Sequence, residues 1–584
     1  MPHPSFPLFN PSPEPIDVMP WEQEPGESLN VASWLVGRAL ERPYQRAVVL
    51  PEGRDALGKR LYSALTVGQL NALCDAYAHG LRARGLKRGD RVLMLVSQSF
   101  ELIALTYALF KMGAVPVMID PGMGRKPFLK CIEQSTPRAM IGIPRGHLAK
   151  KLFSGAFKSV EMTFITEKKF WAGAESLHEL ADFEAGHFPL EATANEELAA
   201  ILFTSGSTGI PKGVHYTHGI FDGQVRAIGQ MYGIEPGEIE VPAFPLFSLF
   251  SIALGMTCVL PDMDPSKPAT VDPAHIVEAI LDHGATTAFG SPAVWKRVGP
   301  YCAERGLKLP SLKRILTAGA PIHPSLMEQF TEILAEGVAI HTPYGATENL
   351  PVSSISSIEV LEETYEKTRQ GKGLCVGYPV PGMLVRIIEV TDEPIDSWSE
   401  AKGSSTGEVG EICVSGAVTT RAYDRMEEKT REAKIPDPER GKSAFWHRMG
   451  DVGYLDEEGR LWYCGRKKHR VETASGTLYS IQCESIFNTH PALLRTALVG
   501  HASRGGEQRH ETPVILFELE PGETMPGHEE FLALARSNPV TASIEHFVHY
   551  PESFPVDRRH NAKIHREELK AWLEAQAIDG LSPR

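Results

Sequence analysis

The sequence predicts an α/β protein with a large N-terminal domain of several subdomains and a small, mobile α+β domain at its C-terminus. Its 584 residues exceed what one hydrophobic core holds, while 42% hydrophobic and 23% charged residues are ordinary for a globular protein. Short apolar strands alternate with helices through the first half, and shorter, turn-rich segments follow residue 377. We expect a proline-rich leader at 1–20, a large domain at 21–467 and a small domain at 468–584.

The alternation begins after the leader. Residues 92–96 read as an apolar strand, 100–112 as an apolar helix and 114–119 as a second strand. An alternation of this kind predicts a parallel sheet. The same pattern predicts further strands at 139–143, 199–203, 286–289, 313–317 and 338–341.

A phosphate loop is predicted at L-F-T-S-G-S-T-G-I-P-K-G, residues 202–213, directly after an apolar strand. Its three glycines, Gly206, Gly209 and Gly213, allow positive φ and let backbone amides face an anion. Four hydroxyl side chains and Lys212 add donors and charge. The Walker pattern is excluded because Pro211 precedes the lysine and glycine follows it. The alternative, a Gly/Ser linker, fits the proline and lysine poorly.

Three later strands each end in a motif. These are A-F-G-S-P at 288–292, T-A-G-A-P at 317–321 and H-T-P-Y-G-A-T-E at 341–348. One Gly-Ala-Pro turn is as often an ordinary loop. Three in register indicate a binding site, because ligands of α/β proteins bind at the carboxyl ends of the strands.

The last third of the chain is predicted to contain a hinge. A charged segment, G-R-K-K-H-R-V at 465–471, lies between apolar strands and follows the motif M-G-D-V-G-Y-L-D at 449–456. Beyond it, strands and a helix at 497–499, 514–519, 531–536 and 547–550 predict one small domain. G-x-S-x-G at 403–407 is not a nucleophile elbow, because a strand rather than a helix follows it.

Composition excludes several classes of partner. A formal charge of -14 disfavours nucleic acid and gives no polybasic patch for a membrane surface, so we expect a small-molecule substrate. The eight cysteines lack zinc spacing and are expected to be reduced core thiols. The leader lacks the basic start and apolar run of a signal peptide, which predicts a cytoplasmic location.

Residues 241–261 carry no charge and are long enough to span a bilayer. Pro242, Pro245 and several polar residues make a transmembrane helix the weaker alternative. We expect no membrane span, and a buried wall that suits an apolar substrate.

The loop motif T-S-G-S-T-G-x-P-K-G, with Y-G-A-T-E and the later motifs in the same order, resembles the adenylate-forming superfamily. That superfamily includes acyl-CoA synthetases, firefly luciferase and peptide-synthetase adenylation domains. The resemblance covers nearly the whole chain after the leader. It implies an enzyme that uses ATP and Mg²⁺, transfers a carboxylate to the α-phosphate of ATP and expels pyrophosphate.

The resemblance also implies roles for individual residues. Lys212 would bind the β- and γ-phosphates, Tyr344 would stack on adenine, Thr347 would contact the α-phosphate, Glu348 would hold Mg²⁺, and Asp451 would accept hydrogen bonds from the ribose hydroxyls. The implied nucleotide-binding residues are Thr204, Ser205, Gly206, Ser207, Thr208, Gly209, Gly319, Ala320, Pro321, Tyr344, Gly345, Thr347, Asp451 and Arg466.

Three further assignments concern catalysis, movement and the acyl chain. Lys563 matches the lysine that reaches the carboxylate and α-phosphate during adenylation, so Lys563, Glu348 and Lys212 are the candidate catalytic residues. Lys468 matches the hinge about which the small domain swings between two half-reactions. Acyl-CoA synthetases often have Phe-His near the acyl pocket, and this chain has Phe-Ser; the pocket is assigned to Phe247, Ser248 and Phe250.

Y-G-A-T-E-N-L-P-V-S-S-I at 344–355 and H-N-A-K-I-H-R at 560–566 most resemble the bacterial olefin-biosynthesis branch, the β-lactone synthetases. This implies adenylation of a long-chain 2-alkyl-3-hydroxy acid and attack by its own hydroxyl, giving a β-lactone and AMP. It also implies association with other olefin-pathway enzymes, a β-lactone decarboxylase and a reductase.

Two departures from the superfamily pattern bear on the acceptor. Asn561 and Ala562 replace the usual Ser-Gly before the catalytic lysine, and Ser480 replaces a proline, which puts the use of CoA in doubt. A long-chain fatty-acyl-CoA synthetase that uses CoA is the nearest alternative. A second alternative is a non-catalytic lipid- or nucleotide-binding protein that has kept the fold. The presence of Lys212, Glu348, Asp451 and Lys563 together argues against it.

Overall fold

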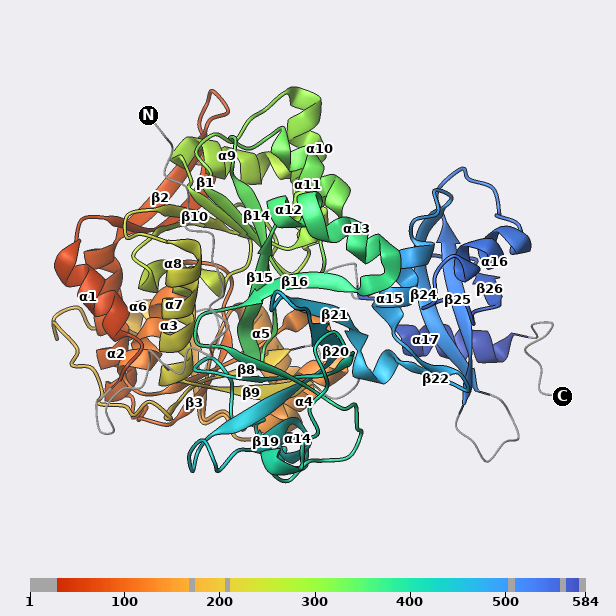
Figure 1. Cartoon of the computed structure of the whole chain (residues 1–584). Helices are drawn as coiled ribbons and strands as arrows, with labels where there is room; N and C mark the ends of the chain where they lie inside the picture. Colours follow the sequence, from red (N-terminus) through yellow and green to blue (C-terminus); the bar gives the residue numbers. More distant parts are fainter. Residues whose placement is uncertain (1–28, 167–173, 205–210, 503–509, 557–562, 577–584) are drawn as a thin grey trace.

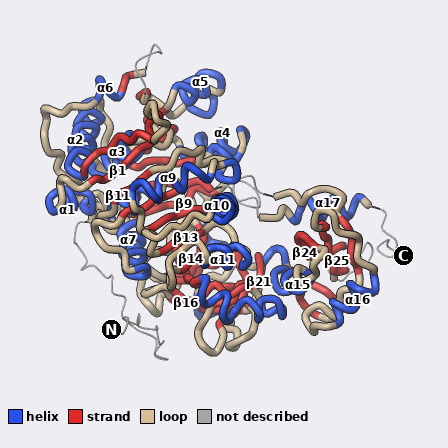
Figure 2. Tube along the Cα trace, turned by 90° about the horizontal axis from the view of Figure 1, so that it is seen from above, coloured by secondary structure: helices blue, strands red, loops and turns tan. Residues whose placement is uncertain are grey.

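The computed structural model describes residues 29–166, 174–204, 211–502, 510–556 and 563–576. A large domain holds two extended sheets, and a small domain lies beside it, blue in Figure 1. Figure 2, turned by 90°, shows the same two bodies side by side. The predicted α/β fold is therefore confirmed. The leader predicted at 1–20 lies outside the described residues.

The first sheet contains β3 (Arg91–Leu95), β4 (Val115–Ile119), β5 (Ala139–Gly142), β6 (Met162–Ile165), β7 (Glu175–Ser176), β8 (Leu198–Thr204) and β9 (Lys212–Thr217). Their order is β7-β6-β5-β3-β4-β8-β9, and every pair is parallel except β8 with β9. The accompanying helices are α2 (Val67–Ala83), α3 (Phe100–Lys111), α4 (Arg125–Ser135), α5 (Pro144–Leu152), α6 (Leu177–Leu180) and α7 (His218–Tyr232).

Strand β3 shows why this sheet is buried on both faces. Val92 and Met94 belong to one core cluster with Ala104 of α3, whereas Leu93 packs on the opposite face with Ile132 of α4. Successive side chains of a strand point to opposite faces, so a strand covered on both sides is apolar throughout.

The second sheet contains β1 (Arg46–Arg54), β2 (Arg60–Thr66), β10 (Ile239–Pro242), β11 (Thr257–Val259), β12 (Thr287–Gly290), β13 (Arg314–Thr317), β14 (Ala339–Ala346), β15 (Asn349–Ser356), β16 (Leu374–Pro379), β17 (Leu384–Ile388), β18 (Gly410–Ser415), β19 (Lys434–Pro436), β20 (Phe445–Leu455) and β21 (Leu461–Arg466). Their order is β17-β18-β20-β21-β16-β15-β14-β13-β12-β10-β11-β1-β2, with β19 paired to β20. The helices here are α1 (Ser33–Glu41), α8 (Phe247–Ala253), α9 (Pro273–His283), α10 (Pro292–Arg305), α11 (Pro324–Thr331), α12 (Ser357–Glu359), α13 (Tyr365–Lys367) and α14 (Glu427–Ala433).

The strands predicted from one alternation thus belong to two sheets. Followed in the order of the sheet, neighbouring strands are parallel from β1 to β14 and antiparallel from β14 to β17. The change to shorter segments after residue 377 falls within this antiparallel part.

Strand β14 is longer than predicted. The strand expected at 338–341 continues to Ala346, because His341 through Ala346 pairs with β15 in an antiparallel hairpin. Tyr344 and Gly345 therefore lie within a strand, and Thr347 and Glu348 form the turn that joins the two strands.

The small domain contains β22 (Val471–Thr473), β23 (Gly476–Leu478), α15 (Ser480–Phe487), β24 (Leu493–Ala502), β25 (Glu511–Leu519), α16 (His528–Arg536), β26 (His546–His549) and α17 (Arg566–Ala575). One face of its sheet packs Leu498 and Phe517 against α15 and α16, and the other packs Leu516 against α17. A short 3-10 turn, Lys467–His469, joins it to β21.

The uncharged stretch at 241–261 folds as the end of β10, the seven-residue α8 and the short β11. Within the described ranges no helix has the length and apolar character needed to cross a bilayer. All eight cysteines are buried and unpaired, as predicted.

Candidate active site

The predicted phosphate loop connects β8 and β9. Thr204 and Lys212 pair with each other at the ends of these strands, so the loop closes an antiparallel hairpin. Ser205, Gly206, Ser207, Thr208 and Gly209 lie outside the described residues. Lys212 directs its ammonium over the Tyr423 ring, 4.5 Å from the ring centroid.

The prediction of positive φ at Gly213 is wrong. Gly213 continues β9, and its φ is not among the positive values. A side chain is excluded there by packing, since a Cβ would lie 2.7 Å from the Phe203 ring and 3.1 Å from the Asp424 Cβ.

A buried carboxylate anchors the strand that leaves the loop. Asp424 forms ion pairs with Arg91 at 2.8 Å and His215 at 3.0 Å, and its backbone amide donates to the Gly213 carbonyl at 2.7 Å. Burial would raise the pKa of Asp424, but the hydrogen bond from His215 and the charge of Arg91 lower it below the usual value.

Three predicted nucleotide residues meet where β14 faces β20 and β21. Asp451 and Arg466 are direct neighbours across these antiparallel strands and form an ion pair at 3.0 Å. The Tyr344 hydroxyl donates to the other Asp451 oxygen at 2.5 Å. Burial raises the pKa of Asp451, and the charges of Arg466 and Lys563 oppose the rise.

The turn that carries Thr347 and Glu348 is fixed by two tyrosines. Tyr216 donates to the Thr347 carbonyl at 2.6 Å, and Tyr423 donates to Glu348 Oε1 at 2.7 Å. Gly345 has no room for a side chain, because a Cβ would lie 2.6 Å from the Asn349 carbonyl oxygen. The turn therefore holds the Glu348 carboxylate in one direction.

The loop after β13 contains Gly319, Ala320 and Pro321. Gly319 has φ +96, a conformation that favours glycine, and both it and Pro321 are exposed. Among the described residues, no hydrogen bond or ion pair links them to Asp451, Arg466 or Tyr344.

Lys563 and Lys468 connect the small domain to this region. Lys563 is exposed, and its charge opposes the rise that burial causes in the pKa of Asp451. Lys468 forms an ion pair with Glu567 at the start of α17. Lys563 thus acts on the large-domain cluster, whereas the ion pair of Lys468 is with the small domain.

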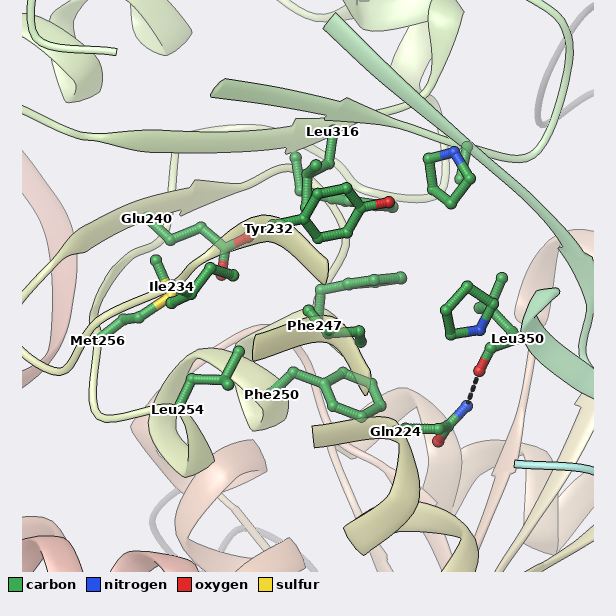
Figure 3. A pocket seen from close by; sticks show the side chains of 15 residues that line it. Gln224, Tyr232, Ile234, Glu240, Phe247, Phe250, Leu254, Met256, Leu316 and Leu350 are labelled. Carbon is green, nitrogen blue, oxygen red and sulfur yellow. Dashed lines mark hydrogen bonds between the residues drawn. The ribbon is translucent and has the colours of Figure 1, made fainter. Parts of the chain in front are cut away.

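An apolar cavity of about 590 Å³, including its open mouth, lies next to the turn (Figure 3). Phe247 stacks on Phe289 with centroids 3.7 Å apart, and Phe250 also lines the cavity. Ser248 is not among the residues that line it, and its hydroxyl donates to the carbonyl of Pro245, which precedes α8. The cavity has the largely apolar lining, with a few polar groups, that is typical of a small-molecule site.

The cavity also contains an acid that the sequence did not single out. Glu240 lines it and is buried, and burial raises the pKa of this carboxyl to about 7, against the hydrogen bond from Ser251. An alternating strand pattern over 239–242 is the signal that could have found it.

Sequence reasoning also missed Tyr423 and Lys434 beside the phosphate loop. Lys434 Nζ lies 6.0 Å from the Tyr423 ring centroid and 3.5 Å from Thr420 Oγ1. Burial lowers the pKa of Lys434 to about 7, with Glu348 opposing and Lys212 reinforcing the shift. Their signal was weak, because each is a single polar residue outside any motif.

The described residues contain no group of three or more His, Cys, Asp or Glu side chains that could hold a metal ion. One carboxylate, Glu348, faces the region of Lys212 and Lys434. This fits Mg²⁺, which proteins often bind through one or two carboxylates together with substrate phosphates and water.

The chain is similar along most of its length to known proteins. A family model described as AMP-binding enzyme matches residues 41–424. The olefin beta-lactone synthetase of Xanthomonas campestris pv. campestris is 42% identical, over 94% of this chain and 98% of its own, and that of Stenotrophomonas maltophilia is 43% identical over the same shares. The solved amide bond synthetase McbA of Marinactinospora thermotolerans superposes with a TM-score of 0.74 at 22% identity, covering 93% of this chain and 99% of McbA.

Proposed function

The chain belongs to the AMP-binding enzyme family, and we propose that it adenylates a long-chain 2-alkyl-3-hydroxy acid and closes the product to a β-lactone. The observation that carries this proposal is the similarity to olefin beta-lactone synthetases along nearly the full length of both chains. The apolar cavity next to the Thr347–Glu348 turn supports it, because Pro343 and Leu350 on either side of the turn line that cavity.

Nucleotide binding is assigned to the cluster around Asp451. Its Oδ1 is buried and, in the described part of the chain, receives no hydrogen bond of good geometry despite the ion pair with Arg466. A ribose hydroxyl would supply the missing donor, which makes ATP a good fit here. Lys212 and the loop amides would then bind the β- and γ-phosphates.

In the first step, a carboxylate oxygen of the acid attacks the α-phosphorus of ATP, and the bond to pyrophosphate breaks. Thr347 would contact the α-phosphate, and Lys563 would stabilise the charge that develops between the two substrates. When bound at Glu348, Mg²⁺ would neutralise phosphate charge. The products are the acyl-adenylate and pyrophosphate.

In the second step, the 3-hydroxyl oxygen attacks the carbonyl carbon of the mixed anhydride. The new C–O bond closes a four-membered ring, the bond to the phosphate oxygen breaks, and AMP leaves while the hydroxyl proton passes to a base or water. Nucleophile and electrophile belong to one molecule, which provides proximity, and the mixed anhydride provides the driving force.

The proposal predicts the products. A 3-hydroxy acid with ATP alone should give AMP, pyrophosphate and a neutral product lighter than the acid by one water, detected by mass spectrometry. A matched acid without the 3-hydroxyl should stall as bound acyl-adenylate, because activation is intact but the internal nucleophile is missing. CoA should change neither result.

The opposite pattern would identify an acyl-CoA synthetase. In that case the unsubstituted acid would turn over rapidly only with CoA and release a thioester.

Ser480, one of the departures from the superfamily pattern, is buried at the start of α15, and its Oγ lies 2.4 Å from where a Cβ on Gly465 would be.

We further propose that the small domain begins near Lys468 and turns about it. Trypsin should cut the free protein between 467 and 470, and ATP with the acid should protect these bonds, because closure orders the hinge. Lys402 provides an internal control: its side chain is 77% exposed, and its cleavage should not change with ligand. Mass spectrometry of the fragments locates the cuts. Cleavage confined to Lys402 would contradict a moving small domain.

A further inference from the structure

The described lining of the apolar cavity includes three polar side chains, those of Gln224, Tyr232 and Glu240. Two of them have partners within the protein. The Tyr232 hydroxyl shares a hydrogen bond with Ser354 Oγ at 3.1 Å, and Glu240 accepts one from Ser251. Gln224 differs, because its Oε1 is buried and receives no hydrogen bond from any described residue.

The orientation of the Gln224 amide is fixed by its surroundings. Gln224 lies on α7 with 2% of its surface exposed, and its Nε2 donates to the Leu350 carbonyl at 2.8 Å (Figure 3). A carbonyl oxygen only accepts, so the amide nitrogen must face Leu350 and the amide oxygen must face elsewhere. A buried acceptor in this state is unfavourable until a donor reaches it.

Gln224 lies where the cavity meets the reaction site. Leu350 is two residues beyond Glu348, and Tyr216 donates to the Thr347 carbonyl at 2.6 Å. Burial raises the pKa of Tyr216, and a hydrogen bond from the Gln224 side chain opposes that rise. The glutamine amide is therefore adjacent to the residues that hold the turn.

We propose that Gln224 Oε1 accepts a hydrogen bond from the 3-hydroxyl of the acid and so selects 3-hydroxy acids at the adenylation step. This inference rests on the proposed function. The carbon that bears the 3-hydroxyl is separated from the carboxyl carbon by one carbon atom, so the hydroxyl lies near the carboxyl end of the chain, where Gln224 lies. An amide cannot take up the hydroxyl proton at neutral pH. Gln224 therefore binds and orients the hydroxyl and leaves deprotonation to another group.

The test compares two acids in pyrophosphate exchange, the 3-hydroxy acid and its 3-deoxy analogue. Gln224→Met keeps the length of the side chain and removes the acceptor. Its kcat/KM for the hydroxy acid should fall about 10-fold or more, whereas that for the deoxy acid should stay within about twofold. Tyr232→Phe is the matched control in the same cavity, and it should change both acids equally.

A second measurement uses the wild-type enzyme and does not depend on the folding of a variant. A 3-fluoro acid is similar in shape to the hydroxy acid but donates no hydrogen bond, so its adenylation kinetics should match those of the deoxy acid. If the variant loses activity on both acids, this measurement decides the matter.

Two results would overturn the inference: an unchanged preference in Gln224→Met, or a 3-fluoro acid adenylated as well as the hydroxy acid. Either leaves the proposed function intact provided that the wild type still makes lactone. A thioester formed from the deoxy acid with CoA would instead count against the proposed function itself.

Discussion

Replacing Lys563 with alanine is expected to lower the rate of acyl-adenylate formation about 100- to 1000-fold while ATP still binds. The lysine's charge acts on the buried Asp451, which is one of the proposed nucleotide contacts. The other proposed ATP contacts, Lys212 and Asp451 among them, come from the large domain and stay in place. Pyrophosphate exchange measures the rate, and calorimetric titration with ATP measures binding.

Lys570→Ala is the matched control for this prediction. Lys570 lies on α17 seven residues further along and pairs with Glu511 of β25, within the small domain. Its loss should leave pyrophosphate exchange near the wild-type rate. If Lys563→Ala also exchanges pyrophosphate at that rate, the lysine is structural and the assigned role of the small domain is wrong.

The second large effect concerns stability. Arg448→Met is expected to lower the free energy of unfolding of the large domain by about 3–5 kcal/mol, because it leaves a buried carboxylate without its main partner. Arg448 pairs with Glu411 at 2.6 Å, and the two side chains are 4% and 1% exposed. The same guanidinium donates to the carbonyls of Thr391 and Glu393.

Denaturant unfolding followed by tryptophan fluorescence measures this loss, with Arg386→Met as the control. Arg386 lies on β17 of the same sheet but is exposed, and its guanidinium donates to the neighbouring Val385 carbonyl. Its replacement should cost less than about 0.5 kcal/mol. A loss below about 1 kcal/mol for Arg448→Met would show that Lys467, which also contacts Glu411, is a sufficient partner.

The sequence predicted features that depend on local patterns. Apolar alternation located several strands of both sheets. The motifs indicated the chemistry, because a motif depends only on a few neighbouring residues. Strand pairing was beyond local patterns. Nothing near His341 indicates that the chain continues as a hairpin with β15, so the predicted end of that strand was too early.

Residues that gain their role from a distant partner were missed for the same reason. Gln224 is a single polar residue on a helix. Its orientation is fixed because its amide nitrogen donates a hydrogen bond to the carbonyl of Leu350, 126 residues away. Tyr423 likewise meets Glu348 across 75 residues. Ser248 was the opposite case: the sequence placed it in the acyl pocket by comparison with Phe-His, whereas its hydroxyl donates to the nearby Pro245 carbonyl.

The Asp424 anchor has a consequence for splitting this protein into fragments. Arg91, His215 and the loop strand come from the first half of the chain, whereas the carboxylate that holds them arrives more than 200 residues after His215. A fragment that ends before Asp424 would contain the whole loop motif and yet leave two basic side chains facing each other without their counter-ion. Cutting at the exposed Lys402 should therefore yield two halves that bind nucleotide only after they reassemble.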